Sequence, residues 1–286
     1  MKIFRIDING PLKDFVLVPI FDLHLGSRFR DVKLWKRLKN YIMNNNNVYF
    51  YIGGDLLEFI PISDKRFQAS NYEEDFLQNA DRILNYSIER AVEELWDIRD
   101  KCLWIHGGNH ESKFYSSFGL DPIAFIANEL GVANATLDHE CIVSLRFLQV
   151  RNRKIIIYSH HGAGSSQKGG TLLNRVEDLA ISFDADVYIM GHSHQLGFIS
   201  KPYLTTDLTG KSLIRREKYF LRIGGFRFAR VEGVMGYEER LGYRPTGIGT
   251  FLLKWKIDLS RPLDSIHPNK QNRFFDSFQL IVESFK

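Results

Sequence analysis

The chain has 286 residues, of which 44% are hydrophobic and 25% are charged, with a formal net charge of +4. This composition is that of an ordinary folded globular protein, and it excludes collagen-like and intrinsically disordered chains. Two cysteines, Cys102 and Cys141, are too few for a disulfide framework, so both are expected to be small buried hydrophobic residues. No window approaches the roughly 18 consecutive apolar residues of a membrane span, so we expect a soluble, cytoplasmic protein without a membrane partner.

Apolar runs and helical periodicity alternate along the first two thirds of the chain. Residues 15–20 (FVLVPI) and 48–52 (VYFYI) are continuous apolar runs, typical of strands buried on both faces. A helix is predicted at 31–43, and the longest helix at 72–99, where Leu77 and other apolar residues recur at three- and four-residue steps. The other elements predicted here are a strand at 102–105, a helix at 121–130, a strand pair at 141–150 and 154–158, a helix at 171–183 and a strand at 187–190. This alternation is typical of a layered α/β fold.

Beyond His194 the pattern changes to antiparallel strands, predicted at 212–228 and 251–257, and no helix is expected there. No linker marks a second domain. Residues 1–286 are therefore predicted to form a single domain, with its core motifs in 15–195 and completing strands and a peripheral segment in 196–286. Residues 201–250 carry ten Lys and Arg against five Asp and Glu. This excess suits a polyanionic partner, and equally a solvated face of edge strands.

Five short polar patterns fall at or shortly after the predicted strand ends. They are Asp22-Leu23-His24, Gly54-Asp55-Leu56-Leu57-Glu58, Gly108-Asn109-His110-Glu111, His160-His161-Gly162 and Gly191-His192-Ser193-His194. The carboxyl ends of strands in α/β sheets converge on one crevice, so these residues are expected to meet there. Imidazole, carboxylate and amide oxygen suit divalent ions such as Mn²⁺, Zn²⁺ or Fe, whereas Mg²⁺ favours oxygen. The patterns hold six of the nine histidines, and His106, His139 and His267 are interpreted as structural.

The order D-x-H, G-D-x-x-E, G-N-H-E, H-G and G-H-x-H closely resembles the calcineurin-like metallophosphoesterase superfamily. The resemblance covers residues 15–195 and extends more loosely to about 257. It implies an α/β fold in which a two-sheet β-sandwich is flanked by helices, in four αββα layers. Within the superfamily, the motif set resembles DNA-repair-type exonucleases and similar phosphoesterases of phages.

The resemblance also implies roles for individual residues. One metal ion would be held by Asp22, His24 and His194, the other by Asn109, His161 and His192, and Asp55 would bridge the two. His110 would be the catalytic histidine, acting with Asp55, while Glu58 and Glu111 would fix loops or orient ligands. His161 is preferred over its neighbour His160, because the superfamily usually uses the histidine directly before the glycine.

The predicted function is a metal-dependent phosphodiesterase or nuclease, with DNA and RNA as the candidate substrates. The resemblance implies two divalent ions, with Mn²⁺ preferred and Zn²⁺ or Fe as alternatives, and in-line attack of a metal-bound hydroxide on phosphorus. His110 would stabilise or protonate the leaving oxygen. Aromatic residues interleaved with Lys and Arg in 201–250 would bind a strand by stacking and phosphate contacts, or would be core residues of strands. The sequence predicts no oligomeric state.

Three alternative functions are considered. A phosphomonoesterase, including a protein phosphatase, is the first, but serine/threonine phosphatases carry G-D-x-x-D-R-G where this chain continues with Glu58, Phe59 and Ile60. The second, UDP-diacylglucosamine hydrolase, shares D-L-H-L and G-D-L-x-E but has Arg in place of His110. The third, a catalytically silent scaffold, would be expected to have lost ligands. The glycine-rich residues 162–170 (GAGSSQKGG) are interpreted as a connection rather than a phosphate-binding loop.

Overall fold

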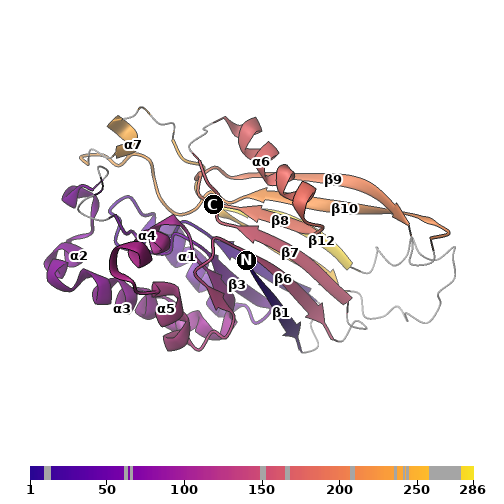
Figure 1. The fold of residues 1–286 in the computed structure, drawn as a ribbon, viewed down its shortest axis with the longest axis horizontal. Helices are drawn as coiled ribbons and strands as arrows, with labels where there is room; N and C mark the ends of the chain where they lie inside the picture. The colour runs from indigo at the N-terminus through magenta and orange to yellow at the C-terminus, as the bar shows by residue number, and fades with distance from the viewer. Residues whose placement is uncertain are drawn as a thin grey trace.

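The computed structural model describes residues 1–9, 14–60, 64, 67–148, 153–164, 168–206, 210–234, 237–240, 242, 245–257 and 278–286. Two six-stranded sheets form a sandwich with helices on the outer faces (Figure 1). The expected two-sheet architecture flanked by helices is therefore confirmed. The prediction that residues 1–286 form a single domain stays a prediction.

The first sheet carries the N-terminal half of the candidate site. Its order is β12-β11-β2-β3-β4-β5. The strands are β2 (Asp14–Ile20), β3 (Val48–Gly53), β4 (Cys102–His106), β5 (Ala135–Thr136), β11 (Thr250–Ile257) and β12 (Phe278–Phe285). Strands β2 to β5 are parallel, while β11 runs antiparallel to both β2 and β12. The carboxyl ends of β2, β3 and β4 therefore lie at one edge of this sheet.

The second sheet carries the C-terminal half of the candidate site. Its order is β1-β6-β7-β8-β10-β9. The strands are β1 (Lys2–Ile8), β6 (Glu140–Phe147), β7 (Arg153–His160), β8 (Val187–Met190), β9 (Gly197–Thr206) and β10 (Leu213–Arg222). The predicted pair β6 and β7 is antiparallel, whereas β7, β8 and β10 run parallel to one another.

Helices cover both outer faces of the sandwich, as Figure 1 shows. They are α1 (Val32–Asn44), α2 (Glu74–Gln78), α3 (Ile83–Leu95), α4 (Asn109–Phe118), α5 (Pro122–Leu130), α6 (Gly169–Ser182) and α7 (Tyr237–Arg240), with short 3₁₀ segments η1 (Ala69–Asn71), η2 (Ala80–Arg82) and η3 (Trp96–Lys101). Helices α1, α3 and α5 pack on the first sheet and α6 on the second. None of the helices in the described part of the chain combines the length and apolar character needed to cross a membrane.

The core between the two sheets is built from alternating strand residues. Leu17 of the first sheet and Ile157 of the second are both fully buried there. The rings of Tyr51 and Trp104 stack with centroids 3.9 Å apart. Cys141 is buried in the same core, as expected, while Cys102 is only partly buried.

The predicted helix at 72–99 is wrong as a single element. The chain forms α2, a 3₁₀ turn, α3 and a second 3₁₀ segment instead. The break falls at Asn79, whose side-chain amide donates to the carbonyl of Asp75 at 2.8 Å and so competes with helical backbone bonding. Leu77, expected on the apolar side of the helix, is 40% exposed.

Several elements were not predicted. They are the strands β1, β5, β9 and β12 and the helices α4 and α7. Helix α7 contradicts the expectation that no helix follows His194. The predicted strand at 212–228 ends at Arg222, because the glycines after it turn the chain. His267 lies outside the described residues.

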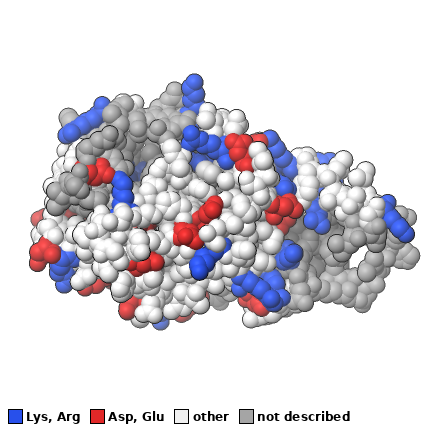
Figure 2. Space-filling model, viewed as in Figure 1, with Lys and Arg blue, Asp and Glu red and all other residues white. Residues whose placement is uncertain are grey.

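The basic excess of residues 201–250 is partly neutralised by neighbouring acids. Lys201 pairs with Glu177, and Lys218 pairs with Asp184 at 2.7 Å. On the face drawn in Figure 2, basic and acidic side chains are interspersed rather than gathered into one patch. Phe220 and Phe226 are core residues, whereas Phe228 is 37% exposed.

Substitutions in the sheets should lower the stability of the protein more at positions buried between the sheets than at exposed positions. Ile157→Ala in β7 should lower the free energy of unfolding by about 2–5 kcal/mol, because it leaves a cavity in a fully buried site. Ile3→Ala in β1 of the same sheet is the control, since Ile3 is 72% exposed. Urea denaturation followed by tryptophan fluorescence measures both, and equal losses would contradict the described packing.

Candidate metal centre

The structure brings residues of all five polar patterns to one edge of the sandwich. Two clusters of predicted ligands have donor atoms that lie within 4.8 Å of one another, and they are Asp22, His24 and His194, and Asp55, His161 and His192. A third group with the same spacing, His24, Glu58 and His110, adjoins the first cluster. The first sheet supplies Asp22, His24 and Asp55 from beyond β2 and β3. The second sheet supplies His161 from beyond β7 and both His192 and His194 from beyond β8. The candidate site therefore spans both sheets.

The backbone at this edge is held in an uncommon conformation. Among the described residues, the non-glycine residues with positive φ are Asp22, His24, Asp55, His192 and His194, at 48° to 67°. A left-handed conformation is costly for such residues and persists where the surrounding structure imposes it. Every one of them is a predicted ligand, so the strain in the described chain is concentrated at the candidate site.

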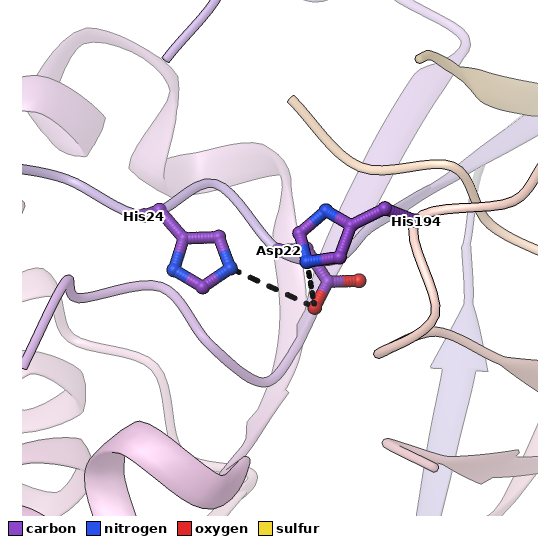
Figure 3. Close-up of side chains that lie close together, drawn as sticks. All are labelled: Asp22, His24 and His194. Atoms are coloured by element: carbon purple, nitrogen blue, oxygen red, sulfur yellow. Dashed lines mark ion pairs between the residues drawn. The ribbon is translucent and has the colours of Figure 1, made fainter. Parts of the chain in front are cut away.

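The first cluster is centred on the Asp22 carboxylate (Figure 3). Oδ1 of Asp22 lies 3.9 Å from Nε2 of His24 and 3.9 Å from Nε2 of His194. The other oxygen of Asp22 accepts a hydrogen bond from the His192 backbone N–H at 2.9 Å. Nδ1 of His24 lies 2.7 Å from Oε2 of Glu58, which turns Nε2 of His24 toward Asp22. Glu58 thus orients this imidazole.

The second cluster is centred on the Asp55 carboxylate. Its Oδ2 lies 3.2 Å from Nε2 of His161, and its Oδ1 accepts from the His110 backbone N–H at 2.9 Å. The carbonyl of Gly53 lies 3.0 Å from Nδ1 of His161 and accepts a hydrogen bond from the N–H at that position. This bond orients the ring so that Nε2 faces Asp55. The Asn109 amide lies 3.1 Å from Nδ1 of His192, which places this predicted residue in the same cluster.

Several donor atoms in these clusters are buried without a hydrogen-bond partner in the described part of the chain. They include Oδ1 of Asp22, Nε2 of His24 and Nδ1 of His194. A buried polar atom without a partner is expensive, so such atoms call for a ligand. Their mixed nitrogen and oxygen chemistry fits a divalent transition-metal ion.

The electrostatics of the clusters also favour a cation. Burial, together with the nearby charge of Asp55, raises the pKa of Asp22 to about 6, against the lowering effect of His161. Burial also raises the pKa of Asp55, but the neighbouring His161 and His110 hold it well below its ordinary value. The pKa of His161 rises to about 10, because the attraction of Asp55 outweighs the effect of burial. The two buried carboxylates therefore draw positive charge into the site.

His110 lies beside both clusters at the start of α4. Its Nδ1 accepts a hydrogen bond from the Phe59 backbone N–H at 2.9 Å, so the ring proton is on Nε2. That Nε2 lies 3.9 Å from Oδ2 of Asp55. Burial lowers the pKa of His110, which keeps the ring neutral. His110 is thus arranged as a neutral hydrogen-bond donor.

Glu111 joins two of the motif loops. Its carboxylate accepts from the backbone N–H groups of Asp55 at 2.9 Å, Leu57 at 3.0 Å and Gly108 at 2.9 Å. The bond to Gly108 satisfies the backbone N–H of the residue that precedes α4 and so stabilises the start of this helix. One buried side chain therefore sets the relative positions of the loops after β3 and β4.

The other described histidines lie outside the two clusters. Nδ1 of His160 accepts from the Gly162 backbone N–H at 2.7 Å, and its Nε2 is 3.9 Å from Glu140. The structure therefore places His161, and not His160, in the cluster. His106 is buried and contacts Ser159. His139 supports the site through its backbone carbonyl, which accepts from the His161 N–H at 2.6 Å.

Close backbone approach explains the glycines of the motifs. A Cβ on Gly54, where φ is +93°, would lie 2.5 Å from Nδ1 of His161. A Cβ on Gly108 would lie 2.4 Å from Oδ1 of Asp55, and one on Gly225 would lie 2.6 Å from the Cβ of Asp22. Gly225, after β10, is not part of the five sequence patterns, and the structure places it against the first cluster.

Two buried arginines near the site were also missed by the motif analysis. Arg222 is 2% exposed and bonds Ser193, the residue between His192 and His194. Arg227 is 6% exposed, and its Nε lies 3.9 Å from Oε2 of Glu58. For Arg222, the available signal was its position in the apolar run that ends at Gly224 and Gly225, and for Arg227 its position between Phe226 and Phe228.

Comparison with known proteins identifies a family for this chain. A model of the family described as calcineurin-like phosphoesterase matches residues 22–196. No curated protein sequence matches the chain.

Three solved structures are reported as similar. The calcineurin-like phosphoesterase YfkN from Bacillus subtilis is 14% identical, with 96% of this chain and 92% of that chain covered and a TM-score of 0.39. Vps29 from Chaetomium thermophilum is 13% identical, with 94% and 96% covered and a TM-score of 0.37. The NAD nucleotidase NadN from Haemophilus influenzae is 10% identical, with 86% of this chain but only 47% of that chain covered and a TM-score of 0.37.

The family match spans more than half of the chain and contains every residue of the two clusters. The chain therefore belongs to the calcineurin-like phosphoesterase family, whose members hydrolyse phosphoesters with divalent metal ions.

Proposed function

We propose that this protein is a phosphodiesterase with a binuclear metal centre, acting as a nuclease on nucleic acid. The observation that carries the proposal is the pair of neighbouring clusters around Asp22 and Asp55, with buried donor atoms that lack hydrogen-bond partners in the described chain. Asp22, His24 and His194 would hold one ion, and Asn109, His161 and His192 the other. Asp55 would bridge them, a role supported by its electrostatic coupling to both Asp22 and His24.

The preferred ion is Mn²⁺, which suits the carboxylate and amide oxygens of the donor set, with Zn²⁺ or Fe as alternatives that suit its four imidazoles. The Asn109 side chain would present its oxygen to the ion, since the two ends of an amide interchange by a simple rotation. When bound, such ions lower the pKa of water and neutralise the charge of phosphoryl oxygens. The protein positions the donors through Glu58, Glu111 and the carbonyl of Gly53.

His110 would stabilise the leaving oxygen by donating a hydrogen bond from Nε2. This role follows from the Phe59 N–H, which occupies Nδ1 and leaves Nε2 as the protonated nitrogen. A neutral imidazole that donates a hydrogen bond from a buried position is a known electrophilic device in enzymes. Of the two roles expected from the sequence, stabilisation is therefore better supported than proton transfer.

The residue after Glu58 supports a diester rather than a phosphoprotein substrate. Serine/threonine phosphatases have an arginine where this chain has Phe59. Here Phe59 is 4% exposed and packs on Phe114 and Phe118, with ring centroids 5.0 Å and 5.6 Å away. An apolar contact thus occupies the position of a phosphate-binding guanidinium.

The first test is hydrolysis by metal-stripped protein supplied with Mn²⁺. The substrates are labelled single- and double-stranded DNA, bis-p-nitrophenyl phosphate and p-nitrophenyl phosphate. We expect cleavage of DNA and of the diester. Asp55→Asn should abolish turnover and reduce the bound metal, and His110→Gln should lower kcat by about 10²–10⁴-fold with the metal content retained.

Other outcomes would redirect the assignment. Turnover of the monoester alone would favour a phosphomonoesterase. Metal binding without turnover of any of the four substrates would favour a catalytically silent scaffold. Loss of bound metal in His110→Gln would contradict the assignment of His110 as a residue that does not hold the metal, and would favour a ligand role for it beside His24.

The adjacent histidines offer a matched comparison. His161→Gln should lose most of the metal measured by plasma mass spectrometry, together with diester turnover, because it removes a buried donor beside Asp55. His160→Gln should retain both, since His160 bonds Gly162 and lies outside the cluster. The reverse result would assign the ligand to His160.

The motif glycines offer a second comparison. Gly54→Ala should lower the free energy of unfolding by roughly 1–3 kcal/mol, because the added methyl group would overlap the ring of His161. The same overlap should displace His161 and lower the affinity for metal. Gly131→Ala is the control, since Gly131 also has positive φ (+71°) but has open space around its Cβ position. Thermal unfolding and metal titration compare the two, and equal effects would show that backbone strain alone matters at Gly54.

A further inference from the structure

Arg222 is a buried arginine at the edge of the sandwich where the metal clusters lie. It is the last residue of β10, and it pairs in register with Met190, the last residue of β8. Its side chain lies on the same face of the sheet as that of Phe220, two residues earlier, which packs beneath α6. Arg222 is 2% exposed and belongs to none of the five sequence patterns.

The charge of Arg222 has little compensation within the protein. No carboxylate in the described part of the chain lies within 4.0 Å of its guanidinium. Its Nε and Nη1 have no hydrogen-bond partner there either. Burial lowers the pKa of Arg222 to about 10, the charge of Asp22 opposes this shift, and the like charge of Arg175 adds to it. The side chain therefore stays protonated at neutral pH.

Such a side chain lowers the stability of the folded protein. A buried charge without a partner destabilises the native state, and its replacement by an apolar side chain of similar volume is often neutral or stabilising. Stabilisation of the fold is therefore a poor explanation for Arg222. Residues that break this rule are expected at functional sites, where activity requires an arrangement that stability alone would not favour.

The hydrogen bond of Arg222 leads directly to the candidate metal centre. In the described part of the chain, the guanidinium makes one hydrogen bond, which Nη2 donates to the hydroxyl of Ser193. Ser193 lies between His192 and His194, and these two histidines belong to different clusters. Both histidines have positive φ, 67° and 49°. The bond from Arg222 therefore holds the short segment that supplies one predicted ligand to each metal ion.

Backbone contacts of this segment leave a role for a side-chain anchor. The Ser193 N–H donates to the Gly191 carbonyl at 2.8 Å, and the His194 carbonyl accepts from the Gly247 N–H at 2.8 Å. These bonds fix the path of the chain, whereas the Ser193 hydroxyl ties it to the end of β10. Loss of that tie would let both imidazoles move relative to the carboxylates of the two clusters.

We propose that Arg222 is a positioning residue for the metal centre, and that it acts through the hydroxyl of Ser193 on His192 and His194 while it lowers the stability of the metal-free protein. The inference rests on the binuclear centre of the proposed function and does not depend on which phosphoester is the substrate. It requires that removal of the guanidinium harm metal binding and not the fold.

The first test replaces the guanidinium with an apolar side chain. Arg222→Met should leave the melting temperature of the metal-free protein unchanged or raise it, because an unpaired buried charge is removed. The same variant should weaken Mn²⁺ binding, measured by calorimetry, and lower kcat for bis-p-nitrophenyl phosphate, each by about 10–100-fold. Arg222→Lys keeps a charged donor and should retain more of both.

Arg146→Met is the matched control. Arg146 pairs with Asp7 at 2.6 Å. It lies opposite Lys154 at the start of β7, whereas His160 at the end of β7 is next to the metal centre, so Arg146 is at the other edge of the sheet. This variant should leave Mn²⁺ affinity and turnover at the level of the unaltered protein.

A double-mutant cycle tests the route through Ser193. Ser193→Ala should weaken Mn²⁺ binding when Arg222 is present. In Arg222→Met it should cause less than about a twofold further change, because the bond is already absent. Additive losses would overturn the proposed route, since they would show that the two side chains act independently.

The outcomes separate this inference from the proposed function. Failure of the unaltered protein to bind two Mn²⁺ ions would overturn the binuclear centre and this inference with it. Two bound ions, with unchanged Mn²⁺ affinity in Arg222→Met, would overturn the inference alone. Tighter binding in that variant would also overturn it, because the guanidinium would then act only as a like charge to the ions. A lower melting temperature of metal-free Arg222→Met would assign Arg222 to the stability of the fold instead.

Discussion

The site depends on two carboxylates, Asp22 and Asp55, that are buried at the ends of neighbouring parallel strands. Charge in a low-dielectric interior is costly unless opposite charge accompanies it, and each of these groups raises the cost of the other. The surrounding imidazoles supply part of the compensation, most directly His161 against Asp55. Divalent ions would supply the rest, and Oδ1 of Asp22 and Nε2 of His24, which have no hydrogen-bond partner in the described part of the chain, lie where such an ion would be bound.

The rest of the fold holds these groups in place. The ligand residues adopt left-handed backbone conformations that a loop by itself would not keep, and the two sheets provide the rigid frame that imposes them. Glu111 ties the loops after β3 and β4 together, and Arg222 bonds the serine between His192 and His194. Gly54, Gly108 and Gly225 let the backbone approach the ligands closely. Strain, packing and hydrogen bonding thus act together at one edge of the sandwich.

The structure defines the candidate metal centre in more detail than the choice of substrate. The motif residues form the candidate metal centre, and the family match covers all of them. Phe59 fills the position of a phosphatase arginine with an apolar contact. The basic excess of 201–250 is a weaker argument, because Lys201 and Lys218 are paired with acids.

The sequence by itself determined the parts of the protein that depend on local pattern. Apolar runs marked the buried strands β2, β3, β4 and β8, and the polar residues after them were identified because they directly follow those runs. The tertiary structure decided what local pattern does not contain. The edge strands β1, β9 and β12 are recognisable only through their partners, and the helix expected at 72–99 breaks where the Asn79 side chain competes with the backbone. The structure also brought Arg222, Arg227 and Gly225 to the site, because these contacts join segments that lie far apart in the chain.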